Sequence, residues 1–210
     1  MSLIDLIFPR RCYSCNRVGS YFCPDCRPLL TSRPVSFDPG SPFEGRLSMF
    51  KYHSFIKRAV ADLKYGFVTD LVPELSNLVA SLVRSDYPHL YSYWLENSYC
   101  LVPVPLHPFR NNWRGFNQSA LLASAISSDL GLCFNSDLLI RRSYTKSQVK
   151  ISKLQRFTNT VSSFSLGPQI APPRKIILFD DVYTTGSTLR SAASVFPSGT
   201  SIWLFTLAAG

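Results

Sequence analysis

Apolar residues recur at helical spacing in three segments of the chain. The recurring positions are Ile56, Ala59, Val60 and Leu63 in the first segment, and Leu71, Leu75, Leu78, Val79, Leu82 and Val83 in the second. A third helix is predicted over residues 118–130, because Gly131 supplies a stop signal at its end. Each segment can therefore lay one apolar stripe on a core.

Three short apolar runs, over residues 99–104, 175–179 and 201–207, have the character of buried strands. The first two are followed by turn residues and then by a helical pattern. This alternation predicts an α/β fold with a doubly wound parallel sheet, whose ligands bind at the carboxyl ends of the strands. Residues 31–48 are rich in proline and glycine and are predicted to form a connector.

The chain has 210 residues, of which 46% are hydrophobic and 17% charged, so it can bury one main domain with a small appendage. It contains no apolar run long enough to cross a membrane. The opening segment is a poor signal peptide, because Asp5 interrupts its short apolar stretch and two arginines follow it. We therefore expect a soluble protein of the cytoplasm.

The formal net charge of +9 favours a polyanionic partner: a phosphorylated metabolite, nucleic acid or an acidic membrane surface. Residues 138–179 contain no Asp or Glu. The basic residues of this stretch are Arg141, Arg142, Lys146, Lys150, Lys153, Arg156, Arg174 and Lys175. Anion binding is therefore expected to centre on the C-terminal half.

Four cysteines near the N-terminus form two CxxC pairs separated by seven residues. They are Cys12, Cys15, Cys23 and Cys26. This spacing can bring four thiolates into the tetrahedron that a structural Zn²⁺ prefers, and a site with four protein ligands leaves no position for a substrate. Two disulfides or a thiol redox pair are the alternatives, which a reducing compartment disfavours. Cys100 and Cys133 lie in apolar surroundings and are predicted to be buried, inert thiols.

The segment over residues 176–188 carries the clearest chemistry. Four apolar strand residues precede Asp180 and Asp181, and a hydroxyl-rich turn follows, formed by Thr184, Thr185, Gly186, Ser187 and Thr188. Backbone N–H groups and the next helix N-terminus can bind a phosphate there, and glycine lets the backbone approach it closely. The two carboxylates can accept bonds from ribose hydroxyls or help hold a hydrated Mg²⁺. A simple helix cap is the alternative, but it explains only one of these residues.

This segment resembles the phosphoribosyl-pyrophosphate signature of type I phosphoribosyltransferases, and nearly the whole chain resembles the ComF family, which includes GntX-like proteins. Beside the cysteines, the shared motifs are Leu63 Lys64 Tyr65, Val102 Pro103 Val104 Pro105 Leu106, Arg114 Gly115 Phe116 Asn117 Gln118, and the series Arg142, Thr145, Gln148, Arg156 and Asn159. The resemblance implies a type I phosphoribosyltransferase-like parallel sheet with flanking helices, preceded by a small zinc-binding module.

The resemblance also assigns roles to arginines. The loop over residues 106–114 would bind pyrophosphate, with Arg114 as its ligand; the alternative is a capped helix start with Arg114 on the surface. The basic stretch over residues 141–156 corresponds to a mobile loop that would close over the substrate, with Arg142, Gln148 and Arg156 as candidates. A solvated basic hairpin is the alternative there. For Lys64, a hood over the base site and simple solvation both stay open.

We expect three parts in the chain: a zinc-binding module over residues 1–32, a connector and helical hood over 33–98, and the core domain over 99–210. If the protein is an enzyme, Asp180, Asp181, Arg114 and Arg142 form the catalytic set. The reaction would displace pyrophosphate from C1 of the ribose, helped by Mg²⁺ and arginine at the leaving group. Neither a general base nor an acceptor site can be recognised in the sequence.

Two functions therefore compete. The first is a phosphoribosyltransferase, for example in nucleotide salvage, that binds phosphoribosyl pyrophosphate. The second is a non-catalytic accessory of natural transformation, which the ComF resemblance implies: it would handle incoming single-stranded DNA beside a helicase-like competence protein. A basic stretch interleaved with Tyr144 and Phe157 can follow a phosphate backbone and stack bases. The intact acidic pair favours retained binding of the sugar phosphate, since DNA binding alone does not need it.

Overall fold

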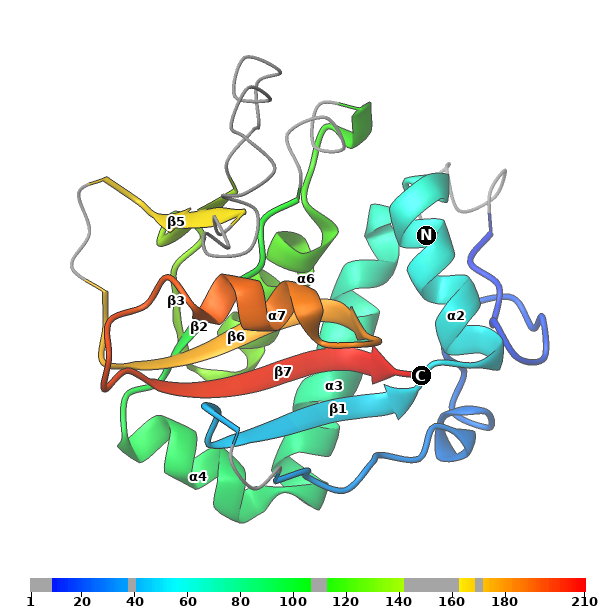
Figure 1. Ribbon diagram of the computed structural model, residues 1–210. Coiled ribbons are helices and arrows are strands. Elements are labelled where there is room, and N and C mark those ends of the chain that lie inside the picture. Colours follow the sequence, from blue (N-terminus) through cyan, green and yellow to red (C-terminus); the bar gives the residue numbers. More distant parts are fainter. Residues whose placement is uncertain (1–8, 38–40, 107–112, 142–162, 169–171) are drawn as a thin grey trace.

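In the computed structural model, a parallel sheet forms the centre of the molecule (Figure 1). The structure describes residues 9–37, 41–106, 113–141, 163–168 and 172–210. Five strands, all parallel to their neighbours, pair in the order β1-β7-β6-β2-β3. They are β1 (Gly45–Lys51), β2 (Cys100–Pro103), β3 (Cys133–Phe134), β6 (Lys175–Tyr183) and β7 (Ser201–Ala209). The predicted parallel α/β fold with flanking helices is confirmed.

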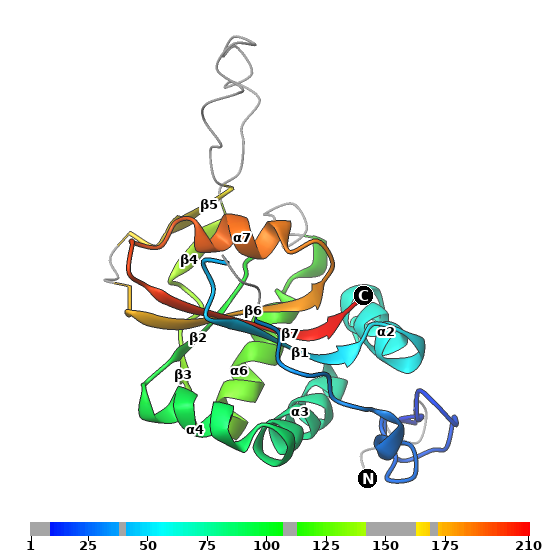
Figure 2. The ribbon, with the colours of Figure 1, turned by 60° about the horizontal axis from the view of Figure 1, so that its bottom comes forward.

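Helices and a small second sheet cover both faces of the central sheet (Figure 2). The longer elements are α2 (Ser54–Ala61), α3 (Val72–Asp86), α4 (Pro88–Glu96), α6 (Gln118–Leu130) and α7 (Ser187–Ala193). Three short helical turns, η1 (Arg27–Leu29), η2 (Asp62–Gly66) and η3 (Thr69–Leu71), join them, and β4 (Leu139–Arg141) pairs antiparallel with β5 (Phe164–Leu166). Among the described residues, no helix is long and apolar enough to span a membrane.

The core has two layers because successive side chains of a strand point to opposite faces. On β6, Ile177 and Phe179 belong to the cluster that includes buried residues of α3, α4 and α6, whereas Ile176 and Leu178 pack with α7 and the β4–β5 pair. The sheet is therefore buried on both faces, as is usual for parallel strands.

Helix α6 illustrates how local signals set element boundaries. The side chain of Asn117 accepts a hydrogen bond from the backbone N–H of Ser119 at 3.1 Å, which caps the first turn. Gly131 adopts the left-handed conformation, with φ of 70°, and ends the helix. The predicted boundaries of this helix are confirmed.

Strand β1 corrects the predicted connector over residues 31–48. Its first four residues fall inside that segment, and its edge pairs with β7, so that Leu47 lies opposite Phe205. Leu47, Met49 and Phe50 are fully buried, which explains why this run forms a strand despite the prolines before it. Because β1 ties residues 33–98 to the main sheet, the expected division of the chain into three parts remains a proposal.

The N-terminal cysteine hairpin docks on helices α2 and α3. The carboxylate of Glu74, on α3, accepts hydrogen bonds from the backbone N–H groups of Tyr21 and Phe22 at 2.9 and 2.8 Å. The guanidinium of Arg58, on α2, donates to the carbonyl of Tyr13 at 2.9 Å. The hairpin is thus held by specific polar contacts in addition to apolar packing.

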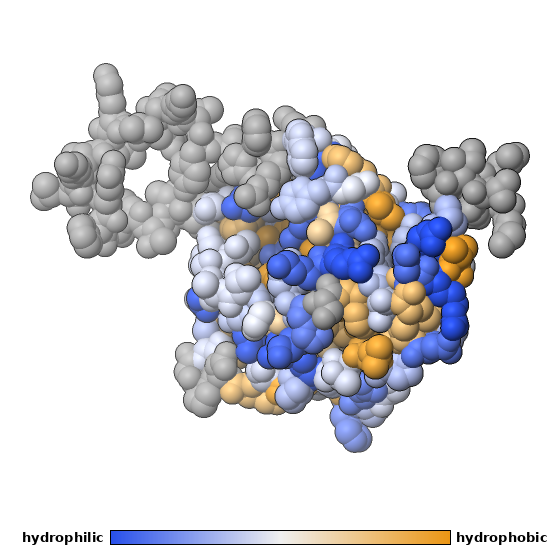
Figure 3. Space-filling model, turned by 90° about the vertical axis from the view of Figure 1, so that its right-hand side faces the viewer, coloured by the Kyte–Doolittle hydropathy of each residue, from blue (hydrophilic) through white to orange (hydrophobic). Residues whose placement is uncertain are grey.

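On the side of the molecule drawn in Figure 3, hydrophilic residues surround smaller hydrophobic patches.

Candidate phosphate and metal sites

The acidic pair lies at the carboxyl edge of the sheet. Strand β2 pairs with β6 only as far as Phe179, whereas β6 continues to Tyr183 beside β7. Asp180 and Asp181 therefore lie within β6 but beyond the end of β2. This offset opens the edge where ligands of parallel sheets bind.

A pocket of about 130 Å³ opens at this edge. Its lining comes from η2, the end of β2, the start of α6, β4, β6 and α7. The lining residues are Lys64, Tyr65, Val104, Pro105, Leu106, Arg114, Gln118, Arg141, Asp180, Asp181 and Thr188. Three cationic and two anionic side chains thus share one small cavity.

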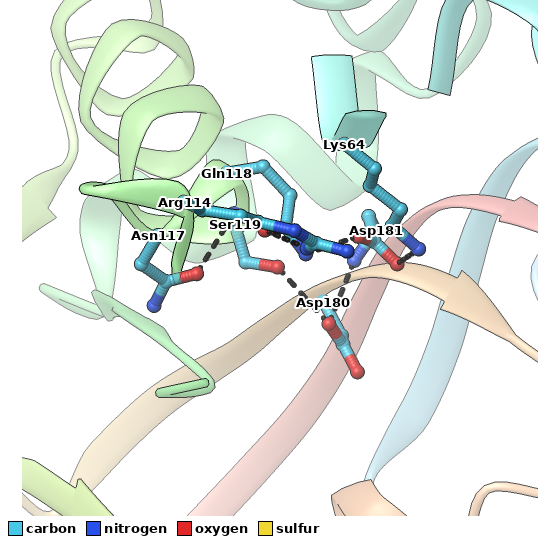
Figure 4. A network of polar contacts seen from close by, with 7 residues as sticks. All are labelled: Lys64, Arg114, Asn117, Gln118, Ser119, Asp180 and Asp181. Carbon is cyan, nitrogen blue, oxygen red and sulfur yellow. Dashed lines mark hydrogen bonds and ion pairs between the residues drawn. The ribbon is translucent and has the colours of Figure 1, made fainter. Parts of the chain in front are cut away.

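Asp181 is almost completely buried and is held by two partners (Figure 4). The ammonium of Lys64 lies 2.8 Å from its Oδ1, and the amide of Gln118 donates to its Oδ2 at 2.7 Å. Both carboxylate oxygens are therefore engaged. Because Lys64 and Asp181 are 117 positions apart in the chain, this ion pair fixes η2 against the sheet.

Asp180 has a different environment. Its Oδ1 accepts hydrogen bonds from the hydroxyl of Ser119 at 3.0 Å and from the backbone N–H of Asp181 at 2.9 Å. Among the described residues, the hydrogen bonds found for this carboxylate all go to Oδ1, and Oδ2 points away from the network in Figure 4. Burial and then the neighbouring charge of Asp181 raise the pKa of Asp180 to about 7, although the hydrogen bonds and Lys64 oppose the shift. Asp180 is therefore the carboxylate with an open oxygen.

Arg114 lies beside the acidic pair and is only 6% exposed. One terminal nitrogen donates to Oε1 of Gln118 at 2.8 Å, and the guanidinium lies 5.0 Å from the centre of the Tyr65 ring. Its buried Nε has no hydrogen-bond partner among the described residues. A buried guanidinium N–H without a partner is costly, so a ligand oxygen at this position would be stabilising.

The hydroxyl-rich turn has a tightly packed centre. Gly186 has a φ of 70°, and a Cβ added there would lie 2.6 Å from the hydroxyl of Tyr183. Thr185 and Ser187 bond each other through their hydroxyls at 3.0 Å. Thr184, Thr185 and Ser187 are exposed, while Thr188 reaches the pocket. A larger residue at this bend would therefore combine backbone strain with a clash against the Tyr183 ring.

The four N-terminal cysteines form a second candidate site. Their sulfur atoms all lie within 4.8 Å of one another, and Sγ of Cys15 is 3.6 Å from Sγ of Cys23. Tetrahedral Zn–S bonds of about 2.3 Å place sulfurs about 3.8 Å apart, so the cluster is close enough to bind a metal such as zinc. Although burial raises it, hydrogen bonds from the backbone around Cys15, Cys23 and Ser14 lower the pKa of Cys12 to about 6.

Comparison with known proteins finds relatives that are named competence proteins or DNA utilization proteins. It is 27% identical to Competence protein ComFC of Bacillus subtilis over 195 residues, which cover 87% of this chain and 75% of that protein. It is 27% identical to DNA utilization protein YhgH of Escherichia coli K12 over 190 residues, covering 88% and 81%. Competence protein F of Haemophilus influenzae is 36% identical over 97 residues, which cover 45% of this chain and 42% of that protein. No family model matches the chain.

The chain resembles the ComF family over most of its length. The two longer alignments span most of the chain, and the resemblance noted from the motifs is thereby confirmed. In this chain, the structure brings four of the predicted site residues around one pocket: Arg114, Asp180, Asp181 and Thr188. Thr184, Thr185, Gly186 and Ser187 form the adjoining turn.

Other predicted positions lie outside the described residues. These are Arg142, Gln148 and Arg156 of the expected mobile loop, Tyr144 and Phe157 of the basic stretch, and residues 107–112 of the expected pyrophosphate loop. The arginine roles assigned there stay predictions.

The structure adds three residues whose roles the sequence left open or did not reveal: Lys64, Gln118 and Ser119. In the sequence, Lys64 belongs to the LKY triplet, and Gln118 and Ser119 directly follow Asn117. Neither pattern predicts a contact with the acidic pair. Lys64 is not merely solvated, because it pairs with buried Asp181. Cys133 corrects another expectation. It is exposed, because β3 is a two-residue edge strand, and it lies opposite buried Cys100.

Proposed function

We propose that this ComF-family protein binds phosphoribosyl pyrophosphate together with Mg²⁺ in the pocket of Asp180, Asp181 and Arg114. The observation that carries the proposal is the juxtaposition of an acidic pair and a buried arginine at the carboxyl edge of a parallel sheet. The acids suit a sugar diol or a hydrated magnesium ion, and the arginine suits pyrophosphate oxygens. A single cavity thus offers groups for both ends of such a ligand.

The two aspartates have different tasks in this proposal. Asp180 uses its open Oδ2 to accept bonds from the ribose hydroxyls or from water on the metal. Asp181 stays bonded to Lys64 and Gln118 and positions the site, since both its oxygens are engaged. Arg114 directs its unpaired Nε at the pyrophosphate. The turn from Thr184 to Thr188 receives the 5-phosphate on its hydroxyl and backbone N–H groups.

Transfer of the ribosyl group to an acceptor is the second candidate. It is favoured by the same placement, because arginine and magnesium at the pyrophosphate would stabilise the departing group. In that reaction the C1–oxygen bond to pyrophosphate breaks and a bond from C1 to the acceptor forms. Arg142 would join the leaving-group site as the expected mobile loop closes.

We also propose a role in DNA uptake during natural transformation. The support is the naming of relatives from three bacteria as competence or DNA utilization proteins. The N-terminal cysteines would hold a structural Zn²⁺ that stabilises the hairpin docked on α3. Binding of the sugar phosphate would be the ligand-dependent property of this accessory protein.

A thermal-shift titration tests the binding proposal. Phosphoribosyl pyrophosphate with Mg²⁺ at about 100 times its Kd should raise the melting temperature by about 5–10 °C. Asp180→Asn keeps the shape of the side chain and should abolish most of this shift. Asp86→Asn removes one carboxylate that does not line the pocket and should leave the shift unchanged. A wild-type melt that ligand and metal leave unmoved would overturn the proposal.

A further inference from the structure

Two cysteines lie opposite each other at the amino end of neighbouring strands. Cys100 begins β2 and Cys133 begins β3, and the two are register partners on these parallel strands. Register partners project their side chains from the same face of a sheet, and neighbouring strands lie about 4.8 Å apart. A disulfide can span such a separation between α-carbons. The spacing of the two strands therefore allows a bridge between these cysteines.

The two thiols have different environments. Cys100 is 3% exposed, whereas Cys133 is exposed on β3, the two-residue strand at the end of the sheet order. An exposed thiol can meet a reagent in solution, while a buried thiol beside it can react only with what the first has captured. An accessible cysteine next to a second, resolving cysteine is typical of sites of reversible oxidation.

The Cys133 thiol also influences the ionisation of its neighbour. Burial, then a hydrogen bond with Cys133 and the charge of Cys133, raise the pKa of Cys100 to about 12. This hydrogen bond places the two sulfur atoms within reach of each other. A Cys133 sulfur that is bonded to a second sulfur carries no charge, so one cause of the raised pKa disappears. Cys100 therefore ionises more readily once Cys133 has reacted.

We propose that Cys100 and Cys133 form a dithiol that a small disulfide, such as glutathione disulfide, converts reversibly to an intramolecular bridge. The Cys133 thiolate attacks one sulfur of the small disulfide, whose S–S bond breaks and releases one thiol. The Cys100 thiol then gives up its proton and attacks the Cys133 sulfur, and the second thiol leaves with that proton. Two protein thiols are oxidised while one disulfide is reduced to two thiols. This chemistry does not depend on the proposed function.

The bridge would close the segment that carries part of the pocket. Residues 100–133 include Arg114, Gln118 and Ser119, which lie beside the acidic pair. The cysteines themselves lie at the opposite edge of the sheet, because Cys100 pairs with the start of β6. Bridging should therefore stabilise the unit of β2, α6 and β3 without altering the pocket. Oxidised wild type should melt about 5–10 °C above the reduced protein, and an unchanged melt would contradict a bridge that fits the native strands.

Peptide mapping of the full chain tests the proposal. The protein is incubated in glutathione buffers of increasing glutathione disulfide content, quenched with acid, alkylated and digested for mass spectrometry. The peptides of Cys100 and Cys133 should be joined in the oxidising buffers, and a reductant should separate them. Mapping also distinguishes this bridge from disulfides among the four N-terminal cysteines. Free thiols in every buffer, or a glutathione adduct that stays on Cys133, would overturn the proposal.

Two variants assign the roles of the thiols. Cys100→Ala lacks the second thiol and should keep the glutathione adduct on Cys133. Cys133→Ser should leave Cys100 unmodified and should lose the rise in melting temperature, because the buried thiol does not meet the reagent. An adduct on Cys100 in Cys133→Ser would overturn Cys133 as the site of attack. The mapping of wild type does not require either variant to fold.

The oxidised protein separates this inference from the proposed function. It should keep the thermal shift with phosphoribosyl pyrophosphate and Mg²⁺, because neither cysteine lines the pocket. A wild-type protein that shows this shift but forms no bridge would contradict the dithiol alone. A protein that forms the bridge but shows no shift in either redox state would contradict the sugar-phosphate site alone.

Discussion

At the scale of single residues, the acidic pair shows how neighbours give two identical side chains different properties. Asp181 has a partner for each oxygen, while Asp180 keeps one oxygen open and carries a raised pKa. The cause is burial first and the charge of Asp181 second. A carboxylate that ionises with difficulty in the free protein gains most from a ligand that brings positive charge or hydrogen-bond donors.

The raised pKa of Asp180 predicts a pH dependence of stability. The folded carboxyl titrates at about 7 and its ordinary value is 3.8, so between these values the folded state binds the extra proton. The free energy of unfolding should therefore fall as pH rises from 4 to 7 and stay level above that range. Asp180→Asn removes this loss and should be more stable than wild type at pH 8, by about 1–3 kcal/mol.

Urea denaturation at a series of pH values measures this difference, and Asp86→Asn is the control for removal of an exposed carboxylate. Parallel stability curves for wild type and Asp180→Asn would show that the carboxyl titrates normally in the folded protein.

At the scale of elements, the turn between β6 and α7 depends on one glycine. Gly186 and Gly199 both have positive φ, but a Cβ meets the Tyr183 ring only at Gly186 and finds open space at Gly199. Gly186→Ala should therefore cost about 1–2 kcal/mol more than Gly199→Ala, since both share the backbone strain and only one adds a clash. Denaturant titration of both variants provides the comparison. Equal losses of unfolding free energy in the two variants would mean that the Tyr183 ring moves aside without destabilising the protein.

The stability of the cysteine hairpin is predicted to depend on its hydrogen bonds to Glu74 of α3. Glu74→Ala removes the acceptor for two backbone N–H groups and should destabilise the protein by about 2 kcal/mol. It should also speed the loss of Zn²⁺ to a chelator, because the hairpin opens more often. Glu96→Ala, at an exposed position on α4, is the control. Chelator absorbance after mixing gives the rate. Equal rates of metal loss in the two variants would mean that the hydrogen bonds to Glu74 do not hold the metal site closed.

Local signals in the sequence predicted some elements well. Asn117 and Gly131 define α6 because capping acts within a few residues, and the apolar run before Asp180 marks β6. Strand β1 was missed because the prolines and glycines before it dominate the segment, and α4 was missed because Trp94 is its one fully buried residue. The contact between Lys64 and Asp181 could not be predicted, since it exists only after residues distant in the chain meet.

At the scale of the whole molecule, one edge of the sheet gathers groups from segments that are far apart in the chain. The turn η2 supplies Lys64, the segment before α6 supplies Arg114, and the first residue of α6 is Gln118. Strand β6 supplies the two aspartates. The cysteine hairpin is anchored to α3, which follows η2 and η3 in the chain. Sugar-phosphate binding and metal binding would therefore act on one packed molecule.

Isothermal titration calorimetry of phosphoribosyl pyrophosphate into the protein, with and without Mg²⁺, tests the central claim most directly. The account predicts one site per chain, with binding that requires Mg²⁺ and falls by at least about tenfold in Asp180→Asn. Heats that are indistinguishable from dilution, or a wild-type affinity retained by Asp180→Asn, would contradict it.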